Sequence, residues 1–282
     1  MTRVDLHVHS TASDGEVDPA RVVAHAASAG VGTLALTDHD TLAGIPAAAQ
    51  AGQTHGVRLI AGCEFSVEVW WGEMHLLGYF LTIGDLELDG FLDEQRQRRS
   101  VRAATIVDRL NDAGVALSFE DVMRESVGAA VGRPHVARAL VVAGAVPDVS
   151  TAFARYLGRG GPAFVAKDLP ELTAVTSLVA RMGGLTSAAH LGRRASRPTL
   201  TRLRDLGVDG VEARHPSHDD TVTAKIERLG GELGMVLTGG SDWHGDKSGH
   251  DNARGLGGID VPGGWVEILD EYVNTKARER SA

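Results

Sequence analysis

Two histidines near the start of the chain have the spacing of a metal site. His7 lies in an apolar run, residues 4–8, that is typical of a β-strand, and His9 follows it directly. Residues two apart on a strand point to the same face, so both imidazoles can reach one ion. Asp14 follows in a Ser-Asp-Gly turn and can fold back over the end of this strand.

Side chains of the same kinds recur beside other apolar runs. They are His39 after the second run, Glu64 at the end of the third, His75 at the start of the fourth, His190 after the fifth, His215 and His218 after the sixth, and Asp242 and His244 after the last. One histidine or carboxylate at such a place is commonly structural or a helix cap, but capping does not select histidine. The pattern therefore predicts a metal centre of imidazoles and carboxylates without thiolate, which suits manganese, iron or zinc.

These apolar runs are the expected strands of a sheet, and helical stretches separate them. Strands are predicted at residues 4–8, 33–37, 57–61, 74–80, 184–189, 208–212 and 235–238. Repeated strand–helix units predict an α/β fold with a parallel sheet and helices outside it. In a parallel barrel the carboxyl ends of the strands converge on one face, where functional sites are built.

The middle of the chain has a different pattern. From about residue 86 to residue 182 strand signals are few, and helices are predicted at residues 95–113, 119–125, 135–143 and 169–181. A block of helices between strands is typical of an inserted subdomain. We therefore predict a barrel domain of residues 1–88 and 165–282, with a helical insertion subdomain of residues 89–164.

The composition limits the partners of the chain. Its 282 residues carry a net charge of −9, which argues against binding of long duplex nucleic acid. No run approaches the roughly 20 apolar residues of a membrane helix, and the first residues lack the apolar core of a signal peptide. We expect a cytoplasmic protein that does not bind membranes, and the sequence makes no prediction of its oligomeric state. The single cysteine, Cys63, excludes a cysteine-rich metal site.

Taken together, the motifs resemble those of the PHP family, named for its polymerase and histidinol phosphatase members. The resemblance covers nearly the whole chain and rests on His7-Val8-His9-Ser10, Ser13-Asp14-Gly15, Thr37-Asp38-His39, Glu64, His75-Leu76-Leu77-Gly78-Tyr79, His190 and Gly240-Ser241-Asp242-Trp243-His244. It implies a distorted (β/α)7 barrel with three divalent metal ions at its carboxyl-terminal mouth, foremost manganese.

The resemblance also implies which residues hold each ion. The expected groups are His7, His9, Glu64 and Asp242 for the first ion, a bridging Glu64 with His75 and His190 for the second, and Asp14, His39 and His244 for the third. Clustered divalent ions lower the pKa of a shared water, polarise phosphoryl oxygens and stabilise the leaving oxygen. The resulting hydroxide would attack phosphorus in line, with Asp242 or a nearby histidine moving the proton.

Arginines in the helical middle offer a grip on a second phosphate, because a guanidinium can donate two hydrogen bonds to it. The resemblance points to the subgroup that acts on nucleoside 3′,5′-bisphosphates and short RNA 5′ ends. Its substrate positions match Arg99, Arg102, Arg133 and His135. We therefore expect a metal-dependent phosphoric ester hydrolase whose partner is a small phosphorylated nucleotide or a short RNA 5′ end.

Other interpretations remain open from the sequence. A metal-dependent amide hydrolase also uses a histidine-rich barrel, commonly with a carboxylated lysine bridging two metals. The expected strand ends here offer no lysine, and Glu64 takes the bridging role. A histidinol-phosphate-type phosphomonoesterase would use the same chemistry, but the arginines of the insertion favour a doubly charged substrate. A non-catalytic polymerase module is disfavoured because every ligand is present.

Overall fold

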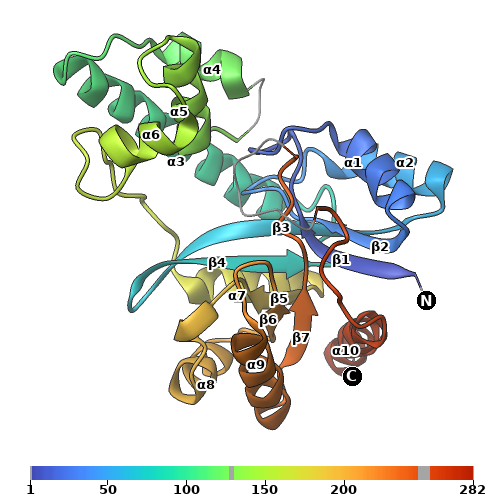
Figure 1. Ribbon diagram of the computed structural model, residues 1–282. Helices are drawn as coiled ribbons and strands as arrows, with labels where there is room; N and C mark the ends of the chain where they lie inside the picture. The colour runs from blue at the N-terminus through green and yellow to red at the C-terminus, as the bar shows by residue number, and fades with distance from the viewer. Residues whose placement is uncertain (1, 127–129, 247–254, 282) are drawn as a thin grey trace.

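The computed structural model describes residues 2–126, 130–246 and 255–281 (Figure 1). Its strands are β1 (Arg3–Val8), β2 (Val31–Leu36), β3 (Arg58–Val69), β4 (Gly72–Tyr79), β5 (Leu185–Ala188), β6 (Gly210–Arg214) and β7 (Val236–Gly239). Its helices are α1 (Pro19–Ser28), α2 (Ile45–His55), α3 (Leu86–Asp112), α4 (Phe119–Ser126), α5 (Arg133–Val142), α6 (Val149–Ala152), α7 (Leu172–Met182), α8 (Arg197–Asp205), α9 (Asp220–Leu233) and α10 (Gly264–Ser281). A π-helical turn, η1 (Phe153–Leu157), and a 3-10 turn, η2 (Gly192–Arg194), complete them. No described helix combines the length and the apolar character that crossing a bilayer requires.

Within the described residues, seven strands form one sheet in the order of the sequence. The pairs β1–β2, β2–β3, β5–β6 and β6–β7 are parallel, whereas β4 is antiparallel to both β3 and β5. The α/β fold is confirmed, but the expectation of an all-parallel sheet is wrong at β4. Only Trp70 and Trp71 connect β3 to β4. A parallel pair would need a crossover of a dozen or more residues, so this short link makes an antiparallel hairpin.

Backbone hydrogen bonds join the chain after β7 to β1. The N–H of Asp242 donates to the carbonyl of His7 over 2.8 Å, and the N–H of His9 donates to the carbonyl of Trp243 over 2.9 Å. Val8 and Trp243 consequently form a parallel bridge. The sheet thus closes on itself at the carboxyl-terminal end of β1, beside the two histidines and with Asp242 in the closing segment.

β3 is longer than the sequence predicts. We expected a strand at residues 57–61 with Glu64 at its end, but β3 continues to Val69 and places Glu64 in its interior. The strand continues because its second half pairs with β4, where Glu64 lies opposite Leu77. On its other side, the N–H of Glu64 donates to the carbonyl of Asp38 over 3.2 Å. The backbone of Glu64 is therefore held by β4 on one side and by the segment after β2 on the other.

The buried apolar residues of the described chain form three clusters. The first fills the space between the strands and the helices that surround them, and the second draws its buried residues only from Ala103 to Ala163. The third gathers strand residues such as Leu6 and Tyr79 with Leu269 of α10. Figure 1 shows α4, α5 and α6 gathered to one side of the strands, with α3 leading to them. α3 links the first two clusters, because Leu88 and Leu92 pack into the first and Leu110 into the second. The separate core favours the helical insertion predicted for residues 89–164, whose boundaries stay a prediction.

Candidate metal centre and substrate pocket

The predicted metal ligands meet at the carboxyl-terminal mouth of the barrel. They lie on or beside β1 (His7, His9), in the following turn (Asp14), after β2 (His39), in β3 (Glu64), in β4 (His75), after β5 (His190) and after β7 (Asp242, His244). His75 lies in the first half of its strand, whereas most of the others follow theirs. It reaches the same mouth because β4 runs opposite to its neighbours.

The first predicted group, His7, His9, Glu64 and Asp242, has ligand atoms that all lie within 4.8 Å of one another. Glu64 Oε2 lies 3.3 Å from His7 Nε2 and 3.1 Å from His9 Nε2. Asp242 Oδ1 lies 3.3 Å and 3.2 Å from the same two nitrogens. Both nitrogens are buried and lack a hydrogen-bond partner among the described residues. Buried imidazole nitrogens are rarely left unpartnered, so this set fits a shared cation.

The predicted third group also assembles, and His9 joins it. Asp14 Oδ1 lies 3.4 Å from His244 Nε2, and Asp14 Oδ2 lies 3.7 Å from His39 Nε2. His9 turns its second nitrogen, Nδ1, toward Asp14 at 3.8 Å. That nitrogen is likewise buried without a hydrogen-bond partner in the described part of the chain. His9 therefore stands between the first and third groups.

Glu64 links the remaining pair to the first group. Its Oε1 lies 2.8 Å from His75 Nδ1 and 3.2 Å from His190 Nε2, while its Oε2 faces His7 and His9. His39 Nδ1 also lies 3.3 Å from Oε2. The two oxygens of one carboxylate thus face different groups, which is the geometry required of a bridging ligand.

The electrostatics of the cluster favour positive charge. Burial alone would raise the pKa of the Glu64 carboxyl, but the imidazoles around it, led by His75, hold that pKa well below its usual value. Burial would lower the pKa of His9, yet the nearby carboxylates of Asp242 and Glu64 raise it to about 10. At His39, burial prevails and lowers the pKa well below the usual value.

Backbone conformation adds a second mark of a functional site. Among the described non-glycine residues, Asp40, Phe80, His190 and Asp242 have positive φ angles of 49°, 57°, 31° and 50°. A non-glycine residue in this left-handed region costs on the order of 1–3 kcal/mol and persists only where surrounding contacts impose it. Two of the four are predicted ligands, so the surrounding contacts hold an unfavourable backbone at these two positions.

Residues that the sequence did not single out orient the ligands. Glu212, fully buried in β6, accepts a hydrogen bond from the backbone of His190 over 2.7 Å, and its other oxygen lies 2.9 Å from His7 Nδ1. Such partners fix the tautomer and direction of an imidazole. The signal in the sequence was a carboxylate between two apolar strand residues, Val211 and Ala213. Of the two histidines after β6, His215 lies 3.3 Å from Asp242 Oδ2, whereas His218 bonds to backbone groups.

A pocket of about 350 Å³ opens over the cluster. Its walls include the predicted Arg99, Arg102 and Arg133 together with Lys167. Arg99 pairs with Asp40, with 2.7 Å between Nε and Oδ2. Arg102 donates to the carbonyl of Val165 over 2.9 Å. Burial and, next, the charge of Arg133 lower the pKa of Arg102 to about 10, so this crowded cationic wall suits an anion.

Lys167 and His135 depart from the sequence analysis. Lys167 belongs to an irregular segment before α7, where no motif marks it, and it pairs with Glu73 and donates to Ser66 Oγ over 3.0 Å. His135 is 1% exposed and does not line the pocket. Its Nδ1 accepts a hydrogen bond from the backbone of Gly132, and its Nε2 lies 3.0 Å from the Ser13 carbonyl. This arrangement fits a residue that positions the two loops rather than one that contacts substrate.

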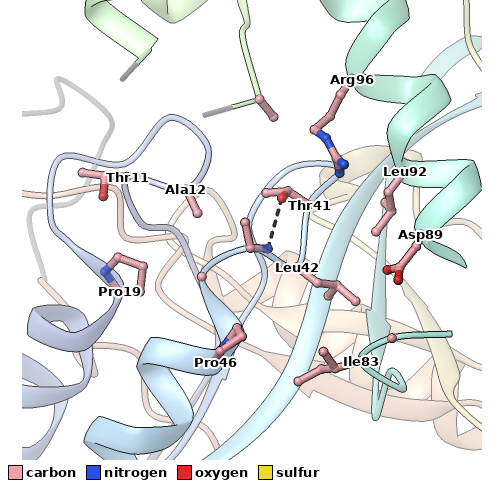
Figure 2. A pocket seen from close by; sticks show the side chains of 14 residues that line it. Thr11, Ala12, Pro19, Thr41, Leu42, Pro46, Ile83, Asp89, Leu92 and Arg96 are labelled. Carbon is pink, nitrogen blue, oxygen red and sulfur yellow. Dashed lines mark hydrogen bonds between the residues drawn. The ribbon is translucent and has the colours of Figure 1, made fainter. Parts of the chain in front are cut away.

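A larger pocket, of about 670 Å³, lies elsewhere (Figure 2). Thr41, Leu42, Leu92 and Arg96 are among its lining residues, and none of the predicted metal ligands belongs to it. Figure 2 shows mainly apolar side chains around it. Size alone therefore does not identify the site in this molecule.

Comparisons with known proteins show which chains this one resembles. A model of the PHP domain matches residues 5–115. The chain is 34% identical to the 3′,5′-nucleoside bisphosphate phosphatase of Chromobacterium violaceum, over 100% of this chain and 98% of that protein. It is 32% identical to the 5′-3′ exoribonuclease of Haemophilus influenzae, over 94% and 93% of the two chains. A solved structure from Bifidobacterium adolescentis, assigned to the metal-dependent phosphoesterases, is 27% identical with a TM-score of 0.87, over 95% and 96% of the chains.

Proposed function

This chain belongs to the PHP-domain family and is a hydrolase, and we propose that it cleaves the phosphoester next to a 5′-phosphorylated nucleoside. Its substrates would be nucleoside 3′,5′-bisphosphates, 5′-phosphorylated short RNA, or both. One observation carries the proposal: a single pocket is lined by candidate metal ligands and by Arg99, Arg102, Arg133 and Lys167. The names of the two relatives support the same pair of substrates.

We propose that the clustered imidazoles and carboxylates hold three divalent ions, foremost manganese. When bound, such ions supply an activated water and polarise the phosphoryl oxygens. Glu64 would hold the groups together, because each of its oxygens faces a different one. Glu212 would keep His7 and His190 in their productive directions. Asp242 Oδ2, which lies 3.3 Å from His215 Nε2, is placed to pass a proton to that histidine.

Arg99, Arg102 and Arg133 would hold the 5′-phosphate beside the cluster. Guanidinium–phosphate contacts are charge-assisted and add direction as well as attraction. Arg99 already pairs with the Asp40 carboxylate, so its guanidinium is held in place before any phosphate arrives. The result would be discrimination in favour of a substrate that carries two phosphates.

Elemental analysis tests the number of ions. Protein prepared without chelator and supplied with manganese or iron should contain close to three ions per chain. Fewer than two would contradict the three-ion proposal and leave only part of the cluster as a metal site.

Paired substrates test the specificity. A charge-assisted contact is worth about 1.5–3 kcal/mol, or roughly 10- to 150-fold in kcat/KM. The kcat/KM for a nucleoside 3′,5′-bisphosphate should therefore exceed that for the matching 3′-monophosphate by that factor. Equal rates would contradict the clamp and favour a histidinol-phosphate-type monoesterase instead. Turnover of amide substrates but not of phosphoesters would favour the amide hydrolase.

A further inference from the structure

A second pocket, of about 320 Å³, adjoins the pocket over the metal cluster. The two share Glu73, His75, Arg133 and His190 as lining residues. Of these two pockets, Arg99, Arg102 and Lys167 line the first and not the second, whereas Trp71 and Arg194 line the second and not the first. The candidate metal ligands His75 and His190 thus stand between a cationic wall and a further cavity.

The lining of the second pocket suits one nucleotide. Arg194 lies on η2 with its side chain exposed, and in the described part of the chain its guanidinium has no hydrogen bond or ion pair. It is therefore available to a phosphate. Trp71 offers an aromatic ring on which any base can stack. Leu191 and Met74 add apolar surface beside it.

The chemistry of the proposed reaction indicates which part of the substrate would lie in the second pocket, and this inference rests on the function proposed above. In a bisphosphate and in RNA alike, water adds its oxygen to phosphorus and the bond from phosphorus to O3′ breaks, with a proton going to O3′. The nucleoside that leaves is the one whose 5′-phosphate faces Arg99 and Arg102. What differs is the group on a second phosphate oxygen, which is a proton or no group in the bisphosphate and the next nucleotide, joined through its O5′, in RNA.

We propose that the second pocket binds the nucleotide on the 3′ side of the scissile phosphate, with its base on Trp71 and its following phosphate at Arg194. The enzyme is then built for 5′-phosphorylated oligonucleotides. A nucleoside 3′,5′-bisphosphate fills only the first pocket and is the limiting short substrate.

Two neighbouring arginines provide the test. Arg193 and Arg194 are consecutive residues of η2 and both are exposed, but only Arg194 lines the pocket. Arg194→Ala should lower kcat/KM on a 5′-phosphorylated trinucleotide roughly tenfold, as loss of a charge-assisted contact does. On the bisphosphate the same variant should stay within about twofold of the parent, as mutants of exposed surface charges do. Arg193→Ala, which removes the same charge, should leave both substrates unchanged.

Binding gives a readout that does not depend on turnover. Fluorescence anisotropy with a 3′-labelled, 5′-phosphorylated trinucleotide and chelator-treated protein should give a Kd weakened roughly tenfold by Arg194→Ala and unchanged by Arg193→Ala. Trp71→Leu should weaken binding about fivefold or more, and Trp71→Phe should restore most of it. Unchanged melting temperatures would show that these variants remain folded.

Two results would overturn the proposal. One is an equal loss on the bisphosphate and the trinucleotide in Arg194→Ala, and the other is an unchanged trinucleotide Kd in that variant. Either result can occur while kcat/KM is still higher for the bisphosphate than for the 3′-monophosphate. In that case the proposed function stands and only the role of the second pocket is refuted. Failure of the proposed function would instead give equal kcat/KM with and without the 5′-phosphate in the parent protein.

Discussion

The barrel mouth and the predicted helical insertion hold their candidate functional side chains in different ways. At the mouth, His7, His9 and Glu64 are at most 1% exposed and lie on or beside strands paired with their neighbours. In the insertion, Arg102 and Arg133 project from helices, are half-buried, and reach backbone carbonyls. The ligand atoms of the barrel side chains lie within 4.8 Å of one another in groups, whereas Arg102 and Arg133 line the same pocket.

This difference separates two tasks. A cluster of ligands must be held to within fractions of an ångström, and paired strands with buried side chains provide that rigidity. A clamp for a phosphate tolerates adjustment, and a unit with its own hydrophobic core can change its surface without disturbing the cluster. Variants at the mouth should consequently impair every phosphoester, while variants in the insertion should alter only the choice among them.

Glu64→Gln should have the largest effect. The carboxylate faces imidazoles from both sides of the cluster, and an amide in its place cannot supply the negative charge. Loss of an outer-shell partner alone costs 10- to 100-fold, so we expect a fall in kcat of about 10³-fold or more on all substrates, with loss of bound metal. The exposed Glu68 of the same strand supplies a matched control, because Glu68→Gln should retain full activity and metal.

His39→Ala should follow, with a fall in kcat of roughly 10²-fold, comparable to the loss of one charge-stabilising group. Its ring lies beside Asp14 and Glu64, so one ion should be lost and the others kept. Kinetics combined with elemental analysis measures both effects. His55→Ala, at the exposed end of α2, should change neither. Near-normal turnover in His39→Ala would remove this residue from the ligand groups.

Arg133→Ala should cause a smaller and selective loss. The advantage of a bisphosphate over a monophosphate should fall by about 10-fold or more, because one charge-assisted contact disappears. Turnover of a small aryl phosphate should stay nearly constant, since the metal cluster is intact. Arg124→Ala offers a control in the same insertion, because that side chain is 73% exposed. A parallel decline on the aryl phosphate would erase the proposed division between the two regions.

Arg96→Ala should have the smallest effect, below about twofold in kcat/KM, because exposed ion pairs contribute little. Arg96 lies on α3 one turn from Arg99, but it pairs with Asp93 and lines the other pocket (Figure 2). Steady-state kinetics on the bisphosphate is the measurement. A loss as large as that of Arg133→Ala would mean that the cationic wall extends along the helix beyond the pocket.

The sequence predicted that these histidines and carboxylates would gather at one place because the signal for each is local. A pair such as His7 and His9 needs only the two-residue period of a strand, and no knowledge of which strands are neighbours. The direction of β4 lay outside that signal, since it depends on a hairpin link and on pairing with β5. The interior position of Glu64 likewise depends on β4 as a partner. Lys167 has no local pattern at all, and its contacts with Ser66 of β3 and Glu73 of β4, both distant in the sequence, hold it at the pocket.

α3 has a mechanical consequence. Its 27 residues, at about 1.5 Å each, make a helix roughly 40 Å long. Leu88 and Leu92 pack one end of α3 against the barrel, and Leu110 packs the other end into the second hydrophobic cluster. Arg99 and Arg102 lie between these two contacts. Because a helix turns about 100° per residue, inserting a single residue between Leu92 and Arg99 would turn both guanidinium groups away from the candidate metal ligands. The number of residues in that span therefore sets the direction from which the two arginines face the pocket.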